Sequence, residues 1–327
     1  MSTLSGEHSH SHRFKPVDVS PSDLGCTSAR TAMCLVGTRI DGKMRRFGFV
    51  ENFLEHVVAP LGGPNSVDLF VNTDSQSLQS DDFKDLEKIW PDCRQRAVAF
   101  DATIRTYPKI PRRCRSLLVM GSALLWNNAT HVLARRLSSC FEQVASEEAR
   151  CQKSYRWVYK HRPDAYLTSD VFGEGKTLGD LEESKAYFVE ARPQHGFNDI
   201  SFLLPRSLAP LALNLSDSRR IPRCFDRVLL QGTCPHALQI NAVYPECLLN
   251  YAMRSMWTSR QVVPHGLCYP LLARDPDALA SSRERHDGNA RQRCELSPAG
   301  NISYYEFCGG RCGRECRRQI NVQHQRC

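Results

Sequence analysis

The stretch TAMCLVGT, residues 31–38, is a continuous apolar run that stops at a glycine and a threonine. Continuous apolar runs are typical of strands that are buried on both faces, as in the middle of a parallel sheet. A second run, SVDLFVNTD at residues 66–74, ends in polar residues in the same way. Between the two runs, apolar residues follow helical spacing at residues 47–58, and a proline and two glycines then end the helix. The order strand, helix, strand predicts a pair of parallel strands.

The same alternation continues along the chain. Helices are expected at residues 81–90, 122–150 and across most of 234–257, and further strands at residues 97–103, 155–161, 185–191 and 199–206. This alternation predicts an α/β fold: a mostly parallel sheet with helices on both faces, in a single main domain. In such sheets ligands bind beyond the carboxyl ends of the strands. Polar residues gather at three of these predicted ends, at residues 38–39, 72–74 and 160–164.

Composition divides the chain into three parts. Residues 1–30 are rich in Ser, His, Pro and Asp without an apolar period, which predicts a disordered leader. Residues 31–270 form the predicted α/β domain, and residues 271–327 form a cysteine-rich tail. In this tail Cys308, Cys312 and Cys316 are spaced differently from the paired cysteines of zinc ribbons. A segment tied by disulfides is the preferred interpretation, with zinc binding as the alternative.

Charge and hydropathy narrow the partners of the protein. Among 327 residues, 24% are charged and the formal net charge is +8, a modest excess that argues against nucleic acid as a partner. No window of eighteen consecutive apolar residues is present, so no transmembrane segment is predicted in this chain. The first residues also lack the apolar core of a signal peptide.

Cysteines and glycosylation signals indicate the compartment. The chain has 15 cysteines and three N-glycosylation sequons, at Asn128, Asn214 and Asn301, which together favour an oxidising environment. The expected location is therefore the secretory pathway, in the Golgi lumen, and the expected product is a disulfide-bonded glycoprotein. The missing signal peptide contradicts this location, and a cytoplasmic protein with many buried thiols is the alternative.

The stretch YRWVYKHRPDAYLTSD, residues 155–170, gives the best candidate for a site. An aromatic, β-prone run ends here in Lys160, Arg162 and Asp164. Arg162 could bind phosphate oxygens through its planar fork, and Lys160 could do so as a point charge. Asp164 could coordinate Mg²⁺ or Mn²⁺ together with a diphosphate. The alternative is a surface loop in which the arginine and the aspartate pair with each other.

Four segments, in the order CLVGTRI, VDLFVNTD, YRWVYKHRPDAYLTSD and GFNDISFLLPR, resemble a family of glycosyltransferase-like proteins from algae and protists. The resemblance covers about residues 31–270. These proteins look like A-type glycosyltransferases, which have a Rossmann-like α/β fold and use nucleotide-diphosphate sugars. The resemblance implies that Arg39 lies near the nucleotide and that Asp164 takes the acidic, metal-binding position. It also implies that Asn198 and Asp199 line the side of the sugar or the acceptor.

The chain departs from this family's pattern at the metal site. A-type enzymes usually carry an Asp-x-Asp motif, whereas the matching residues here are Asp164, Ala165 and Tyr166. The single carboxylate would need help from Asp170 or from a later histidine such as His265 to hold Mn²⁺ or Mg²⁺.

Asp199 directly precedes an apolar strand, so it could act as the base toward an acceptor hydroxyl. An Asn-Asp pair is equally typical of a turn. The predicted function is transfer of a sugar from a nucleotide-sugar donor to a hydroxyl group of a glycan or protein. Two alternatives remain: a non-catalytic glycan- or nucleotide-binding protein of the same fold, and a cysteine-rich interaction protein.

Overall fold

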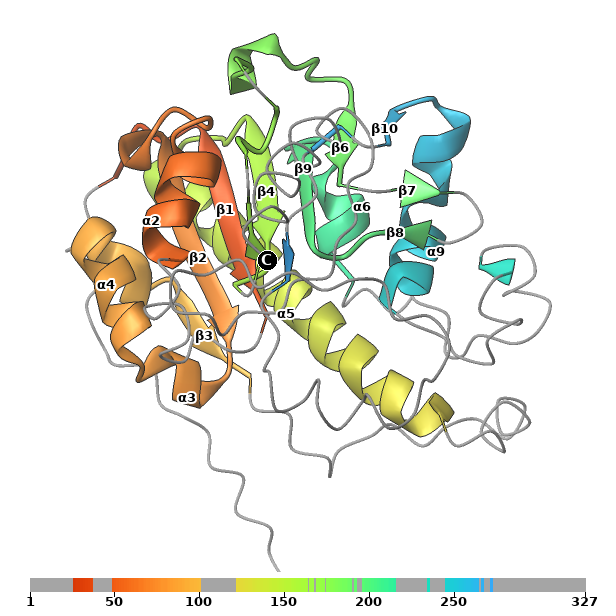
Figure 1. Ribbon diagram of the computed structural model, residues 1–327, viewed down its shortest axis with the longest axis horizontal. Coiled ribbons are helices and arrows are strands. Elements are labelled where there is room, and N and C mark those ends of the chain that lie inside the picture. The colour runs from red at the N-terminus through yellow and green to blue at the C-terminus, as the bar shows by residue number, and fades with distance from the viewer. Residues whose placement is uncertain are drawn as a thin grey trace, which may run out of the picture.

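A seven-stranded sheet organises the described part of the chain in the computed structural model (Figure 1). The strand order is β10-β6-β9-β4-β1-β2-β3. The structure describes residues 26–37, 49–100, 122–163, 165–167, 169–173, 175–189, 191–192, 196–215, 234–235, 245–264, 266–267 and 271–272.

The sheet is mixed, with one strand that runs against its neighbours. Its strands are β1 (Thr31–Val36), β2 (Val67–Thr73), β3 (Ala97–Ala99), β4 (Trp157–His161), β6 (Ala186–Phe188), β9 (Ser201–Pro205) and β10 (Val262–Val263). Only β9 is antiparallel to the strands beside it, β4 and β6, and the other neighbouring pairs are parallel. Two short antiparallel pairs lie outside this sheet, formed by β5 (Ala165–Tyr166) with β11 (Leu271–Leu272) and by β7 (Ala191–Arg192) with β8 (Gly196–Phe197).

The central strand, β1, explains why the first apolar run decides the fold. It lies between β2 and β4 and is parallel to both, so every residue of TAMCLV is buried. Because successive side chains of a strand point to opposite faces, Ala32 and Cys34 pack into one core and Met33 and Leu35 into the other. The prediction of a strand buried on both faces is confirmed.

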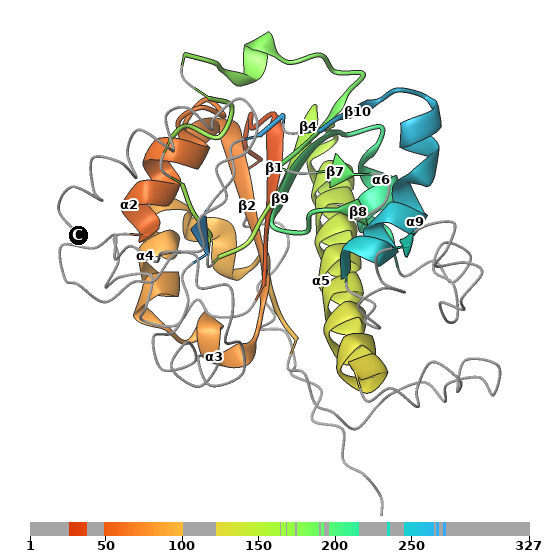
Figure 2. The same ribbon diagram turned by 45° about the vertical axis from the view of Figure 1, so that its right-hand side comes forward.

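Helices cover both faces of the sheet, as Figure 2 shows. One layer, called the α5 layer here, contains α5 (Ser122–Cys151), α6 (Ala209–Leu213) and α9 (Pro245–Thr258). The other, called the α2 layer, contains α2 (Phe49–Phe53), the π-helical turn η2 (Leu54–Val58), α3 (Ser75–Leu78) and α4 (Asp81–Ile89). The predicted α/β class, with a mostly parallel sheet between helices, is therefore confirmed. None of the described helices has the length and hydropathy that a membrane span needs.

Three disulfides join described cysteines. Cys34 of β1 is bonded to Cys140 of α5, and Cys26, which precedes β1, is bonded to Cys151 at the end of α5. The third joins Cys234 to Cys247 of α9. These bonds fit the expectation of a disulfide-bonded protein from an oxidising compartment. The cysteines of the predicted tail and the sequons at Asn128 and Asn301 lie outside the residues whose side chains are described, whereas Asn214 follows α6 and is partly exposed.

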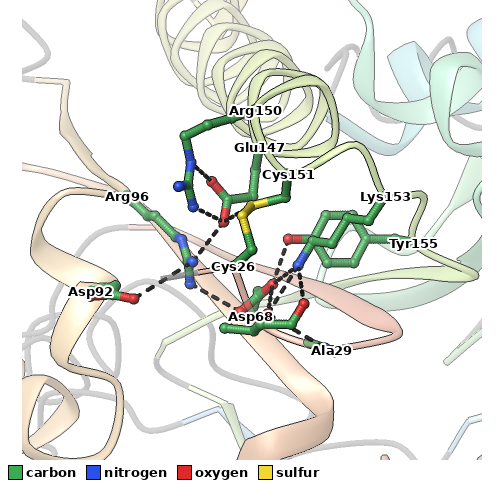
Figure 3. Close-up of a disulfide and its surroundings, with 11 residues drawn as sticks. Cys26, Ala29, Asp68, Asp92, Arg96, Glu147, Arg150, Cys151, Lys153 and Tyr155 are labelled. Atoms are coloured by element: carbon green, nitrogen blue, oxygen red, sulfur yellow. Dashed lines mark hydrogen bonds and ion pairs between the residues drawn. A yellow bond between two sulfur atoms is a disulfide. The ribbon is translucent and has the colours of Figure 1, made fainter. Parts of the chain in front are cut away.

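A buried polar network closes the amino edge of the sheet, where the parallel strands begin (Figure 3). Asp68, near the start of β2, accepts hydrogen bonds from Lys153 Nζ (2.6 Å), Tyr155 Oη (2.6 Å) and an Arg96 guanidinium nitrogen (3.0 Å). Arg96 also donates to Glu147 Oε1 of α5 at 2.7 Å. Burial alone would raise the pKa of Asp68, but these hydrogen bonds and the charge of Arg96 outweigh it, so the pKa lies below its usual value. This network joins β2 to α5 and stabilises the amino edge of the sheet.

Candidate functional site

The strand order creates a switch point at the carboxyl ends of β1 and β4. The strands β1, β2 and β3 follow one another to one side of the sheet, and α5 then carries the chain back to β4 on the other side of β1 (Figure 1). In open α/β sheets the crevice at such a reversal is where ligands bind. The strand within the predicted stretch, β4, therefore ends where a ligand is expected.

Gly37 and Pro163 bring the two strand ends into contact. A β-carbon added to Gly37 would lie 2.6 Å from Pro163 Cδ and 3.1 Å from its Cγ, so only glycine fits. The Gly37 backbone N–H donates to Asn72 O at 3.2 Å, which continues the pairing with β2 past the end of β1. The turn after β4 is thus seated directly on the end of the central strand.

Side chains of β4 alternate between the two layers, and this alternation divides the cluster of bases. His161 is fully buried toward the α2 layer, where its Nδ1 lies 2.7 Å from Ser201 Oγ and its ring packs on Phe53 with centroids 5.5 Å apart. Lys160 points to the α5 layer and is also fully buried. Its Nζ donates to Ile200 O at 3.2 Å. His161 is accordingly a core residue, and Lys160 places a positive charge beneath the carboxyl edge of the sheet.

Arg162 and Asp199 face each other at this edge. Arg162 Nη1 lies 3.9 Å from Asp199 Oδ1, and the two side chains are 30% and 14% exposed. Arg162 therefore keeps the surface that it needs to reach a ligand. The structure brings together Lys160, Arg162 and Asp199, three residues that the sequence predicted for the site.

Asn198 makes the turn that the Asn-Asp pair predicted. Its Oδ1 accepts the Ile200 backbone N–H at 2.8 Å, which is the local hydrogen bond of an Asx turn. The turn is made by Asn198, and Asp199 is left to face Arg162. The side chain of Asn198 thus shapes the loop that presents the aspartate.

Glu246, in the first turn of α9, is the charged neighbour that the sequence interpretation missed. Burial raises the pKa of Glu246 to about 8; the negative charge of Asp199 adds to this rise, and the positive charges of Arg162 and Lys160 oppose it. The sequence signal at this position is a proline followed by an acidic residue, which marks the start of a helix rather than a site.

The remaining predicted ligands are placed elsewhere or are not described. Asp170 Oδ1 lies 3.2 Å from His56 Nδ1, on the η2 turn of the α2 layer. Arg39, Asp164 and His265 lie outside the described residues. Within the described part of the chain, no group of three or more His, Cys, Asp or Glu side chains could hold a metal ion.

Polar residues after β2 serve the local structure. Asp74 caps α3: its Oδ1 accepts the Ser77 backbone N–H at 2.8 Å. Asn72 is fully buried and donates from Nδ2 to Gln143 Oε1 of α5 at 2.8 Å. The polar end of the second apolar run is therefore explained by a helix cap and a contact between layers.

Comparisons with known proteins give a similarity to a solved structure. Mouse xyloside xylosyltransferase 1, crystallised in its apo form, has 9% sequence identity with this chain and a TM-score of 0.29. The similarity covers 72% of this chain and 84% of the other. No protein-family model and no curated protein matches the chain. A similarity of this size does not identify a function. Any argument for a function therefore depends on the residues around the end of β4.

Proposed function

We propose that this protein is a glycosyltransferase, which transfers a sugar from a nucleotide-sugar donor to a hydroxyl group of a glycan or protein acceptor. The observation that carries the proposal is the position of Arg162 and Lys160 at the carboxyl end of β4, beside the switch point of the sheet. A nucleotide-sugar donor carries a diphosphate, and two fixed bases at this edge match its charge.

Arg162 and Lys160 take different parts in holding the diphosphate. Arg162 is exposed enough to donate two parallel hydrogen bonds to phosphate oxygens. Lys160 is fully buried behind it, so it acts through its charge at a fixed position rather than through direct contact. Arg39 is the further residue that the family resemblance assigns to the nucleotide.

Asn198 and Asp199 form the acceptor side in this proposal. The loop that Asn198 shapes holds Asp199 against Arg162, so the acceptor would approach from the side of β8 and β9. In the transfer, the bond between the anomeric carbon and the phosphate oxygen breaks while the acceptor oxygen bonds to that carbon. The hydroxyl proton passes to a carboxylate, and the nucleoside diphosphate leaves.

A divalent metal, Mn²⁺ or Mg²⁺, would supply positive charge to the leaving diphosphate. The described residues do not form a complete set of ligands for it: Asp170 contacts His56, and Asp199 faces Arg162. Asp164, from the family resemblance, is therefore the ligand to test. The disulfides support a place for this activity in the lumen of the secretory pathway, such as the Golgi.

The test measures binding first and turnover second. Thermal unfolding is followed with UDP, GDP and ADP, each with and without Mn²⁺, and nucleotide-sugar hydrolysis is then screened with the matching donors. Arg162→Ala is expected to weaken binding by about 1.5–3 kcal/mol, because a charge-assisted hydrogen bond is lost. Arg254→Ala, which changes an exposed arginine of α9, is the control.

Each outcome separates the candidate functions. Stabilisation by a nucleoside diphosphate with Mn²⁺ that is lost in Asp164→Asn, together with donor hydrolysis, supports the transferase. Stabilisation without turnover of any donor favours a non-catalytic nucleotide-binding protein. No stabilisation by any nucleotide contradicts both.

A further inference from the structure

The disulfide between Cys26 and Cys151 is the most exposed of the three that join described cysteines. Cys26 is exposed and Cys151 is half-buried, whereas all four cysteines of the other two bonds are fully buried. The rate at which a thiolate attacks a disulfide depends on access to the sulfur atoms. A reductant in solution therefore reaches this bond before the other two.

A second disulfide keeps the fold together when the outer bond is broken. Cys34 of β1 is bonded to Cys140 of α5 inside the core, so the central strand and the long helix stay joined. With this inner bond in place, the outer bond closes only a small additional ring, made of residues 26–34 and 140–151. A disulfide that closes a short loop stabilises a protein less than one that closes a long loop. Breaking the outer bond should therefore leave the protein folded.

Thr27, the residue after Cys26, is held in place by contacts that do not need the disulfide. Its Oγ1 donates to Asp68 Oδ2 at 2.7 Å. Lys153 Nζ donates to Thr27 Oγ1 at 2.9 Å and to Thr27 O at 3.3 Å. Because these hydrogen bonds remain after reduction, Cys26 stays close to Cys151 and the bond can form again.

The sulfur atom of Cys151 has a partner for the reduced state. It lies 3.7 Å from Glu147 Oε1, beside the buried polar network (Figure 3). The negative charge of this carboxylate and the C-terminal end of α5 both disfavour a thiolate at Cys151. A protonated thiol, in contrast, can donate its hydrogen to Glu147. The reduced form is thus stabilised as a thiol.

From these observations we infer that the Cys26–Cys151 bond is a disulfide-exchange site, at which a protein dithiol reversibly reduces the folded protein. A thiolate of the dithiol attacks Cys26 Sγ, the S–S bond breaks, and its electrons leave with Cys151 Sγ, which takes up a proton. The second thiolate of the dithiol then attacks the mixed disulfide and releases Cys26, which is protonated in turn. The dithiol is oxidised to a disulfide and the protein is reduced to two thiols.

The first experiment treats the folded full-length protein with thioredoxin, a protein dithiol, and in parallel with dithiothreitol, a small dithiol. Freed thiols are alkylated at intervals and assigned by mass spectrometry. Cys26 and Cys151 should be labelled on the order of tenfold faster than the buried cysteines of the other two bonds, because only the outer bond is accessible. The near-ultraviolet circular dichroism should stay native while this bond alone is reduced.

The second experiment identifies the attacked sulfur and tests the fold separately. A thioredoxin whose second active-site cysteine is replaced by serine should be captured as a mixed disulfide on Cys26. The double variant Cys26→Ser, Cys151→Ser should keep its native circular dichroism and a cooperative unfolding transition. Cys34→Ser, Cys140→Ser, which removes the buried bond between the same two parts of the chain, is the matched control and should lower the unfolding midpoint more.

Each outcome decides for or against the exchange site. Labelling of all three bonds at equal rates, or of Cys26 and Cys151 last, overturns the inference. So does reduction by dithiothreitol without reduction or capture by thioredoxin, because a protein could then not reach the bond. Loss of the native circular dichroism when only this bond is reduced overturns exchange on the folded protein. These measurements need no sugar donor, so their result is independent of the proposed transferase activity.

Discussion

At the residue scale, the alternation along β4 separates the structural from the chemical side chains. Tyr159 and His161 complete the core on the α2 layer, where their rings stack with centroids 5.8 Å apart. Lys160 points to the other face, and Arg162, just past the strand, faces Asp199 of the loop before β9. A shift of one residue in this strand would exchange the two sets, because neighbouring side chains point to opposite faces.

Glu246 should make stability depend on pH. Its pKa is raised from 4.5 to about 8 on folding, so the folded protein binds the proton more tightly than the unfolded chain. The free energy of unfolding should therefore fall as pH rises from about 5 to 8, by a few kcal/mol at most, since the side chain keeps part of its surface in water. Urea unfolding at several pH values checks this. In Glu246→Gln the free energy of unfolding should fall less over this pH range. An equal fall in the wild type and the variant would contradict the prediction.

Gly37→Ala should destabilise the protein by about 1–3 kcal/mol, because the new methyl group meets the rigid Pro163 ring. Its nearest contact, at 2.6 Å, is with Pro163 Cδ. Gly179→Ala is the matched control, since its nearest contact is Thr177 Oγ1 at an ordinary 3.6 Å. Chemical denaturation measures both. If the two variants were equally stable, the close packing of the ends of β1 and β4 would be refuted.

At the element scale, α2 holds the loop that follows β4. Asn52, which is 5% exposed, donates from Nδ2 to Leu167 O at 2.7 Å and accepts the Leu167 backbone N–H through Oδ1 at 2.9 Å. Further along the loop, the Val171 backbone N–H donates to His56 O at 2.8 Å. The segment that begins with Arg162 is therefore anchored at its far end by the first helix of the α2 layer.

Asn52→Ala should cost about 2–4 kcal/mol, because it leaves two buried backbone groups of Leu167 without partners. The anchored loop starts at Arg162, so we also expect weaker nucleoside diphosphate binding in this variant. Denaturant unfolding and thermal shift with UDP and Mn²⁺ measure the two effects. Asn65→Ala, at an exposed asparagine of the turn before β2, should change neither.

The elements themselves could be predicted from the sequence, because apolar runs and helical spacing are local signals. The predicted helix at residues 81–90 is observed as α4 (Asp81–Ile89), and the one at 122–150 as α5 (Ser122–Cys151). The antiparallel direction of β9 could not be predicted, because a buried strand has the same pattern in either direction.

The sequence pointed to candidate site residues only where they flank a strand. Lys160 and Arg162 were found because they stand at the end of an apolar run, and Asp199 because it begins one. Glu246 was missed because its electrostatic interaction with Asp199 joins residues far apart in the chain, which no local pattern specifies. The predicted boundaries at residues 30 and 270 and the roles of Arg39, Asp164, Asp170 and His265 stay predictions.

At the scale of the whole molecule, the carboxyl and amino edges of the sheet carry different sets of charged side chains. At the carboxyl edge, Arg162 is partly exposed and Lys160 is fully buried. The amino edge carries the polar network of Asp68, Arg96 and Glu147 (Figure 3), and all three side chains are buried. α5 spans both edges, with disulfides to β1 and to the segment before it. The buried network and the proposed ligand site thus lie at opposite ends of the same strands.

Asp68→Asn should destabilise the protein by about 3–5 kcal/mol at neutral pH, because Arg96 and Lys153 lose a buried counter-charge. The folded pKa of Asp68 is lowered, so its contribution is present above about pH 4 and is lost as pH falls below that value. The difference in the free energy of unfolding between the wild type and Asp68→Asn should therefore become smaller in acid. Unfolding at pH 7 and pH 3 checks this against Glu55→Gln, an exposed carboxylate of η2. A difference in the free energy of unfolding that stays constant with pH would contradict this role of Asp68.

The disulfide between Cys26 and Cys151 also constrains how the protein is made. Its cysteines are 125 residues apart, and β1 lies between β2 and β4. During synthesis, the central strand leaves the ribosome long before β4, its second neighbour, exists. β1 is therefore made before either of its neighbours, and Cys26 has to stay reduced and accessible until α5 has emerged. A chain that folds in this order depends on thiol-exchange partners in its compartment to keep this early cysteine from a wrong partner.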